Sequence, residues 1–240
     1  MTTAKKEDKL NNQLKKPNSE HSLQIEKLID DTLKKGHKVF LCTDWHLWIR
    51  KEKGSTECHK RKEFEEIIKN VNDTMTKDDV LINLGDLVDG EFQDKDELKS
   101  VLKTLPGHKI LTIGNNDTFP VSFYKSCGFE YVTQSFIWHN VIFSHMPIKN
   151  DNDVNVHGHI HTKPGGHGTY WLPYKNHIDV AYLDGRIKLV PLQDAIDAQP
   201  KYSKLIKEDP SHFDESFSFF EYSMITSDGF MPDPFRDEYM

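Results

Sequence analysis

Five short groups of aspartate, asparagine and histidine recur along the chain, each where an apolar, strand-like run ends. They are Asp44-Trp45-His46, Gly85-Asp86-Leu87-Val88-Asp89, Gly114-Asn115-Asn116-Asp117, His145 and Gly158-His159-Ile160-His161. Carboxylate and carboxamide oxygens and imidazole nitrogens are ligands for Mn, Fe, Ni and Zn, and no thiolate accompanies them here. The groups therefore predict a catalytic metal site and not a structural zinc site.

Such a site could hydrolyse a phosphoester. Asp86 directly follows a glycine at a strand end, and its two oxygens could bridge two ions. Two ions about 3.5–4 Å apart can hold a phosphate beside a hydroxide and neutralise the charge that develops in an in-line attack. We expect Asp44 and His46 to point the same way because strand side chains alternate, and Gly158 to allow a close approach.

The elements that must position these groups alternate along the first half of the chain. Helices are predicted over 19–35, about 64–75, 94–104, 119–126 and 192–198. Strands are predicted at 38–43, 79–84, 108–113, 129–132, 135–138, 140–144, 154–157, 178–183 and 186–190, with turns at His139-Asn140 and Asp184-Gly185 and a loop at 50–58. This rhythm is typical of a layered α/β domain with a second, partly antiparallel sheet packed on the first, and strand ends are where such sheets display their chemistry.

Composition limits the classes of function. The 240 residues favour one large domain, and we expect residues 1–18 to be a mobile arm, 19–195 the domain, and 196–240 an extension docked on the domain or on a partner subunit of a homo-oligomer. The net charge of −7 argues against a nucleic-acid partner, which usually needs a basic face. Three cysteines without a CxxC pair indicate a cytoplasmic location, and we find no signal peptide or membrane-spanning run.

The ordered motifs resemble the calcineurin-like metallophosphoesterase superfamily over residues 38–195, with short spacings similar to its small prokaryotic and phage phosphodiesterases. The resemblance implies a two-sheet β-sandwich flanked by helices, and a small phosphoester as substrate. It also implies two divalent ions, with Mn²⁺ as first choice and Fe, Ni or Zn as alternatives. The implied ligands are Asp44, His46 and His161 for one ion, Asn115, His145 and His159 for the other, and Asp86 between them.

Asn116 departs from the family pattern. Many relatives carry a histidine there, which is proposed to protonate the leaving oxygen, whereas asparagine has no proton that titrates near neutral pH. Its carboxamide can still hydrogen-bond a phosphate oxygen, so Asn116 is our candidate catalytic residue. We therefore expect phosphodiesters, or esters with good leaving groups, as substrates.

Two other functions stay open. A non-catalytic scaffold of the same fold would bind proteins, although all seven ligand positions are filled here. A nuclease would require a local basic groove. Outside the motifs, His157 would share a strand face with His159 and support the ligands, His177 is expected in a loop beside the site, and Trp45 would form an apolar wall or pack in the core.

Overall fold

The computed structural model describes residues 20–47, 55–88, 94–148, 154–159, 177–181, 183 and 185–198. Its helices are α2 (Glu20–Lys34), α3 (Ser55–Thr74), α4 (Lys95–Thr104) and α5 (Val121–Ser126), and residues 192–198 add a short helix. Its strands are β1 (Val39–Cys42), β2 (Val80–Asn83), β3 (His108–Thr112), β4 (Tyr131–Thr133), β5 (Ser135–Trp138), β6 (Val141–Ser144), β7 (Val154–His157), β8 (His177–Asp179) and β9 (Val190–Pro191). The predicted arm and residues 199–240 of the predicted extension lie outside the described residues.

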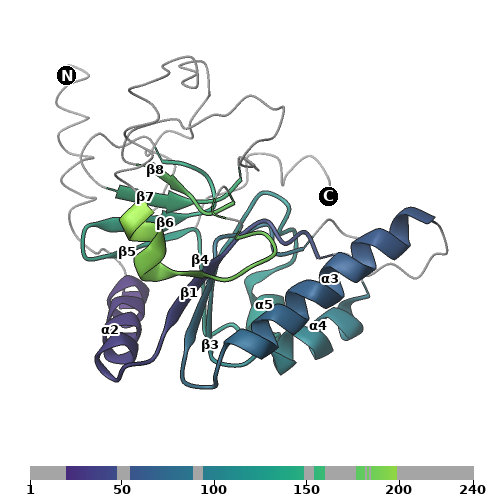
Figure 1. Cartoon of the computed structure of the whole chain (residues 1–240), viewed down its shortest axis with the longest axis horizontal. Coiled ribbons are helices and arrows are strands. Elements are labelled where there is room, and N and C mark those ends of the chain that lie inside the picture. Colours follow the sequence, from purple (N-terminus) through teal and green to yellow (C-terminus); the bar gives the residue numbers. More distant parts are fainter. Residues whose placement is uncertain are drawn as a thin grey trace, which may run out of the picture.

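A five-stranded sheet of order β4-β3-β2-β1-β9 occupies the centre of the domain (Figure 1). Strands β1 to β4 are parallel, and β9 pairs antiparallel with β1. Val39 pairs with Val80, and Val80 pairs with His108, so the first three strands start level. The loops that follow them therefore emerge side by side at one edge of the sheet.

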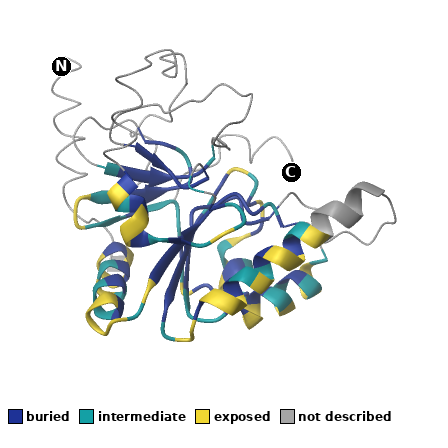
Figure 2. Cartoon of the chain, viewed as in Figure 1, coloured by how far each residue is buried: buried dark blue, intermediate teal, exposed yellow. Residues whose placement is uncertain are grey.

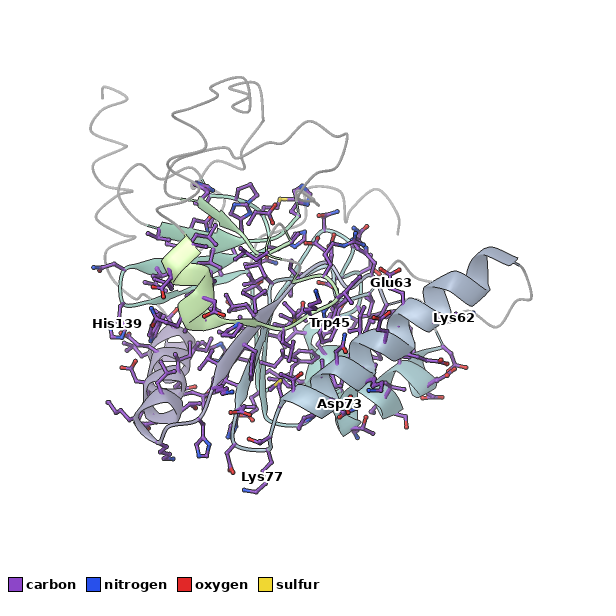
Figure 3. All side chains as sticks on the ribbon, viewed as in Figure 1. Trp45, Lys62, Glu63, Asp73, Lys77 and His139 are labelled. Carbon is purple, nitrogen blue, oxygen red and sulfur yellow. The ribbon has the colours of Figure 1, made fainter. Side chains whose placement is uncertain are left out.

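A second sheet of order β5-β6-β7-β8 is mixed, as predicted, because β5 and β6 form a hairpin and β6, β7 and β8 run parallel. The hairpin turn falls at His139-Asn140, as predicted. Asparagine more often adopts a left-handed φ in such turns, but here the residue that does so is His139, at 52°. Asp30 of α2 accepts a hydrogen bond from Trp138 Nε1 at 2.9 Å and contacts His139 Nε2 at 3.1 Å. Figure 3 shows His139 at this edge, where the hairpin meets α2.

Strand side chains of the central sheet alternate between two buried faces, and each face has its own cover. Phe40 and Leu81 pack in the cluster with α3, α4 and α5, whereas Leu41 and Ile82 pack in the cluster with α2 and the second sheet. Figure 2 shows the central strands buried and the outer faces of the helices exposed. The predicted two-sheet layered architecture is confirmed. It brings the carboxyl ends of β1, β2 and β3 close to the ends of β6 and β7.

Several local predictions are wrong. The strand predicted at 186–190 is not formed over most of that range, since residues 186–188 lie in a turn and a bend and β9 begins at Val190. Residues 55–58 were expected in a loop but open α3, because a run rich in Glu, Lys and Arg has high helix propensity without any apolar period. The predicted turn at Asp184-Gly185 does not join two paired strands, since β8 belongs to the second sheet and β9 to the first. The chain crosses between the sheets there, and Thr43 N–H donates to Gly185 O at 3.0 Å.

Candidate metal centre

The predicted ligands follow the ends of five strands that meet in space. Asp44 comes two residues after β1, Asp86 and Asn115 three residues after β2 and β3, His145 directly after β6, and His159 two residues after β7. The structure therefore brings together six of the seven predicted ligands. The seventh, His161, lies outside the described residues.

Asp44, His46 and Asp86 form the first ligand group, with one ligand atom of each within 4.8 Å of the others. His46 Nε2 lies 3.6 Å from Asp86 Oδ2. The Asp44 carboxylate is fully buried, and it accepts hydrogen bonds from Thr43 Oγ1 at 2.8 Å and His159 N–H at 3.0 Å. Because His159 follows a strand of the second sheet, this contact fastens the two sheets together at the centre.

The second group surrounds His145 Nε2. This atom lies 3.1 Å from Asn115 Oδ1, 3.2 Å from His159 Nδ1 and 3.4 Å from Asp86 Oδ1. Ligand atoms bound tetrahedrally at about 2.1 Å from one ion are separated by about 3.4 Å, so the donor set fits a metal ion. His145 Nδ1 donates to the Leu84 carbonyl at 2.8 Å, which directs Nε2 toward the other candidate ligands.

Asp86 is common to both groups and gives one oxygen to each. Oδ2 faces His46, and Oδ1 faces His145. Burial raises the pKa of Asp86, but the hydrogen bond and charge of His145 and the donors of Asn116 outweigh burial and hold that pKa below its ordinary value. Burial also lowers the pKa of His145, and Asp86 outweighs it and raises that pKa. The carboxylate is therefore ionised and able to bridge two cations.

The ligand backbones are locally strained. Asp44, His46, Asp86 and His159 all have left-handed φ values, of 51°, 44°, 50° and 74°. Such conformations cost on the order of 1–3 kcal/mol each in non-glycine residues and cluster at functional sites. The reason given for Asp44 and His46 pointing the same way is thus wrong, because both lie beyond the strand in tight turns. Backbone bonds to the neighbouring loop hold them: Asp44 N–H donates to Gly85 O and His46 N–H to Asp86 O.

Glycines in the motifs permit the close approach of the ligand loops. A Cβ on Gly158 would clash with Thr43 Oγ1 and stand 2.7 Å from Asp44 Oδ2. A Cβ on Gly114 would clash with the Asp86 carboxylate and lie 3.0 Å from its Cγ. The expected role of Gly158 is confirmed, and each of these glycines admits a ligand from a different motif.

Asn116, the candidate catalytic residue, contacts Asp86. Its backbone N–H donates to Oδ1 at 2.9 Å, and its side-chain Nδ2 donates to Oδ2 at 2.7 Å. The structure thus places the Asn116 carboxamide against a predicted metal ligand.

The sequence pattern of the calcineurin-like phosphoesterase family matches residues 37–220, which is most of the chain. The chain belongs to this family. The membership inferred from the motifs is confirmed, and the protein is in general terms a metal-dependent phosphoester hydrolase.

Other comparisons with the phosphoesterase are distant. No curated protein matches the chain. A solved protein of unknown function from Aquifex aeolicus is similar at 21% identity over 67% of this chain and 97% of its own, with a TM-score of 0.47. The nuclease MPE of Pseudomonas putida is similar at 16% identity over 51% of this chain and 61% of its own, with a TM-score of 0.38. Within the described part of the phosphoesterase, none of the helices combines the length and apolar character needed to cross a bilayer.

Asp117 of the phosphoesterase is a supporting residue that the sequence reasoning left without a role. Its buried carboxylate accepts hydrogen bonds from Gly114 N–H at 2.9 Å, Leu87 N–H at 3.0 Å, Val88 N–H at 3.3 Å and Tyr124 Oη at 3.3 Å. Burial raises its pKa to about 7. Asp117 therefore connects the loop after β2 to the loop after β3. Its position in the motif Gly114-Asn115-Asn116-Asp117 is the sequence feature that could have indicated this role.

Arg186 is a second supporting residue, and no sequence signal pointed to it. Its Nε donates to the Asp44 carbonyl at 3.3 Å from the turn that links the two sheets. The two residues are 142 positions apart, so only the fold reveals this contact.

The remaining side chains of interest are structural. His157 is fully buried on β7 and packs against His177, at 5.2 Å between ring centroids. It does not share a strand face with His159, because His159 leaves the strand with a left-handed φ. His177 begins β8 and is buried, so its predicted loop position is wrong. Trp45 packs in the core with residues of α3, and Figure 3 shows it beside that helix.

Proposed function

We propose that the protein is a phosphodiesterase with two divalent metal ions, and that it cleaves small phosphodiesters to a phosphomonoester and an alcohol. The observation that carries this proposal is the shared carboxylate, since Asp86 belongs to both ligand groups. When bound, the two ions would supply an activated hydroxide and neutralise charge at phosphorus.

In this proposal Asp44, His46 and His161 hold the first ion, and Mn²⁺ is the first choice of metal. Asn115, His145 and His159 hold the second ion, and Asp86 joins the two. The Leu84 carbonyl fixes the His145 ring so that Nε2 faces the ion, and the His159 N–H holds the Asp44 carboxylate in place. These oxygen and nitrogen donors suit Mn, Fe, Ni and Zn alike.

Asn116 supports the choice of substrate class. Its carboxamide has no proton that titrates near neutral pH, so it cannot protonate a leaving alkoxide. Substrates whose leaving group departs without a proton, such as aryl diesters, should therefore react fastest.

The test is hydrolysis by protein stripped with EDTA and then reloaded with Mn²⁺. Aryl and alkyl monoesters and diesters form the substrate panel, and Asp73→Asn, an exposed change on α3, is the surface control. Stripped protein should be inactive, and Mn²⁺ should restore turnover of aryl diesters first. Full turnover in the metal-free protein, or equal turnover of alkyl monoesters, would contradict the proposal.

The same panel separates the alternatives. Cleavage of single- or double-stranded DNA without turnover of small diesters would make the protein a nuclease, which the net charge of −7 does not favour. Two bound ions without turnover of any ester would make it a scaffold. The cytoplasmic location stays a prediction, as does the docking of residues 196–240 on the domain or on a partner subunit of a homo-oligomer.

A further inference from the structure

Asn116 is turned toward the shared carboxylate and contacts both of its oxygens. The side-chain contact, Nδ2 to Oδ2 at 2.7 Å, is the shorter of the two, and the backbone contact to Oδ1 is 2.9 Å. Hydrogen bonds to an ionised acceptor are stronger than neutral ones, so the side chain would have to break a strong contact in order to donate to a substrate. The half-buried carboxamide is therefore committed to Asp86.

The acceptor capacity of Asp86 matches this arrangement. An ionised carboxylate offers about four lone-pair positions, two on each oxygen. One metal bond on each oxygen would use two positions, toward His46 on the Oδ2 side and toward His145 on the Oδ1 side. The two Asn116 donors, again one on each oxygen, fill the remaining two. Asn116 and both ions can thus bind Asp86 at the same time.

The two hydrogen bonds also fix the rotation of the carboxylate. An aspartate side chain is soft at χ2, which has broad and roughly twofold preferences. A bridge requires one oxygen on each ion, so the carboxylate plane must be held in one orientation. The two Asn116 donors, one on each oxygen, hold the carboxylate plane in one orientation. Gly114 has no Cβ, which leaves room for the carboxylate in that orientation.

We propose that Asn116 is a positioning residue that orients Asp86 as the bridge between the two ions. The inference rests on the proposed binuclear centre, and it gives position 116 a role in assembling the metal site instead of in proton transfer. Loss of the Nδ2 donor would release Oδ2 and let the carboxylate plane rotate, so the ion on the His46 side would bind less tightly. A carboxylate at position 116 would add repulsion against Asp86.

The experiment measures Mn²⁺ binding by calorimetry and the magnetic coupling of the bound ions by electron paramagnetic resonance. The variants are Asn116→Ala, which removes the donor, and Asn116→Asp, which keeps the shape. Asn72→Ala, at an exposed position of α3, is the matched control. Both Asn116 variants should bind the more weakly held Mn²⁺ ion at least about tenfold less tightly, which is the usual effect of losing a residue that hydrogen-bonds a metal ligand. They should also lose the magnetic coupling between the two ions. Asn116→Ala in EDTA should unfold at a somewhat lower temperature than the wild type, because it lacks one hydrogen bond, but it should stay folded at the temperature of the binding assay.

The outcomes separate this inference from the proposed function. Unchanged Mn²⁺ affinity and coupling in both variants, with altered turnover, would overturn it and place Asn116 on the substrate. A wild-type protein that binds only one ion would overturn it regardless of activity. If the wild type binds two coupled ions but hydrolyses no ester, the proposed function fails, and a tenfold loss in the variants still supports the orienting role.

Discussion

Two histidine pairs in this protein have nearly the same geometry and very different surroundings. His145 and His159 lie 5.0 Å apart between ring centroids with an interplanar angle of 76°, and His157 and His177 lie 5.2 Å apart at 64°. The first pair lies beside Asp86 at the rim of the sheets. The second pair lies inside the second sheet, on β7 and β8.

Burial acts on both pairs, and a carboxylate decides the outcome. The pKa of His145 is raised because Asp86 outweighs burial, whereas burial lowers the pKa of His157 to about 4 and that of His177 well below its ordinary value. Among the described residues, the ligand groups include His145 and His159 but neither His157 nor His177. In the part of this protein that the structure describes, two neighbouring imidazoles thus belong to a candidate metal site only where carboxylates converge on them.

The largest expected effect is a loss of activity and bound metal when a histidine of the first pair is replaced, compared with a histidine of the second pair. His159→Ala removes a proposed metal ligand. It should lower kcat/KM by more than about 100-fold, because loss of a residue that only hydrogen-bonds a metal ligand already costs up to about 100-fold. It should also reduce the bound Mn²⁺, measured by elemental analysis. His157→Gln should retain both ions. An equal loss of bound metal in the two variants would show that the two histidine pairs do not differ in their role in metal binding.

Gly158 lies between His157 of the buried pair and His159 of the candidate metal centre. Gly158→Ala should destabilise the metal-free protein by about 3 kcal/mol, the upper end for overpacking, because the new Cβ would clash with Thr43 and crowd Asp44. Urea unfolding in EDTA measures this change. Gly36→Ala meets no atom within 4 Å and should cost only about 1 kcal/mol, because its φ of 80° is unfavourable for alanine. Equal costs would show that a small shift of the Thr43 side chain relieves the crowding at Gly158.

The buried pair should make stability depend on pH. The folded-state pKa of His157 is depressed to about 4 from an ordinary 6.5, so its contribution is complete above about pH 6.5 and is lost as pH falls toward 4. A gap of this size corresponds to roughly 3 kcal/mol. Urea unfolding of metal-free protein between pH 8 and pH 4 should show this loss, and His157→Gln should lose less stability over the same range, keeping only the part due to His177. Parallel pH profiles for the two proteins would mean that His157 is not buried in its neutral form.

The smallest expected effect concerns Arg186. Arg186→Gln removes the Nε contact to the Asp44 carbonyl and should cost about 1 kcal/mol of folding stability, the usual net value of one hydrogen bond. It should weaken Mn²⁺ binding by a few-fold, measured by calorimetry beside Lys77→Gln, a change at an exposed lysine. A loss as large as that in His159→Ala would make Arg186 part of the centre itself.

The sequence was sufficient for the features that depend on local pattern. Strongly apolar runs located β1, β2, β3 and β6 to within a residue or so, because buried strands are rich in apolar side chains, and the weaker run Val154-Asn155-Val156 located β7. The candidate ligands follow these strands. The left-handed turns at Asp44 and His46 could not be foreseen, since they depend on bonds to the loop of another strand. Contacts across the fold, such as Arg186 with Asp44, have no local signal.

A crystal structure of the protein loaded with Mn²⁺ tests the central claim most directly. Anomalous scattering should show two ions about 3.5–4 Å apart, each bonded to a different oxygen of Asp86. Asp44 and His46 should bind one ion, and Asn115, His145 and His159 the other. A single ion, or two ions that do not share Asp86, would contradict the account.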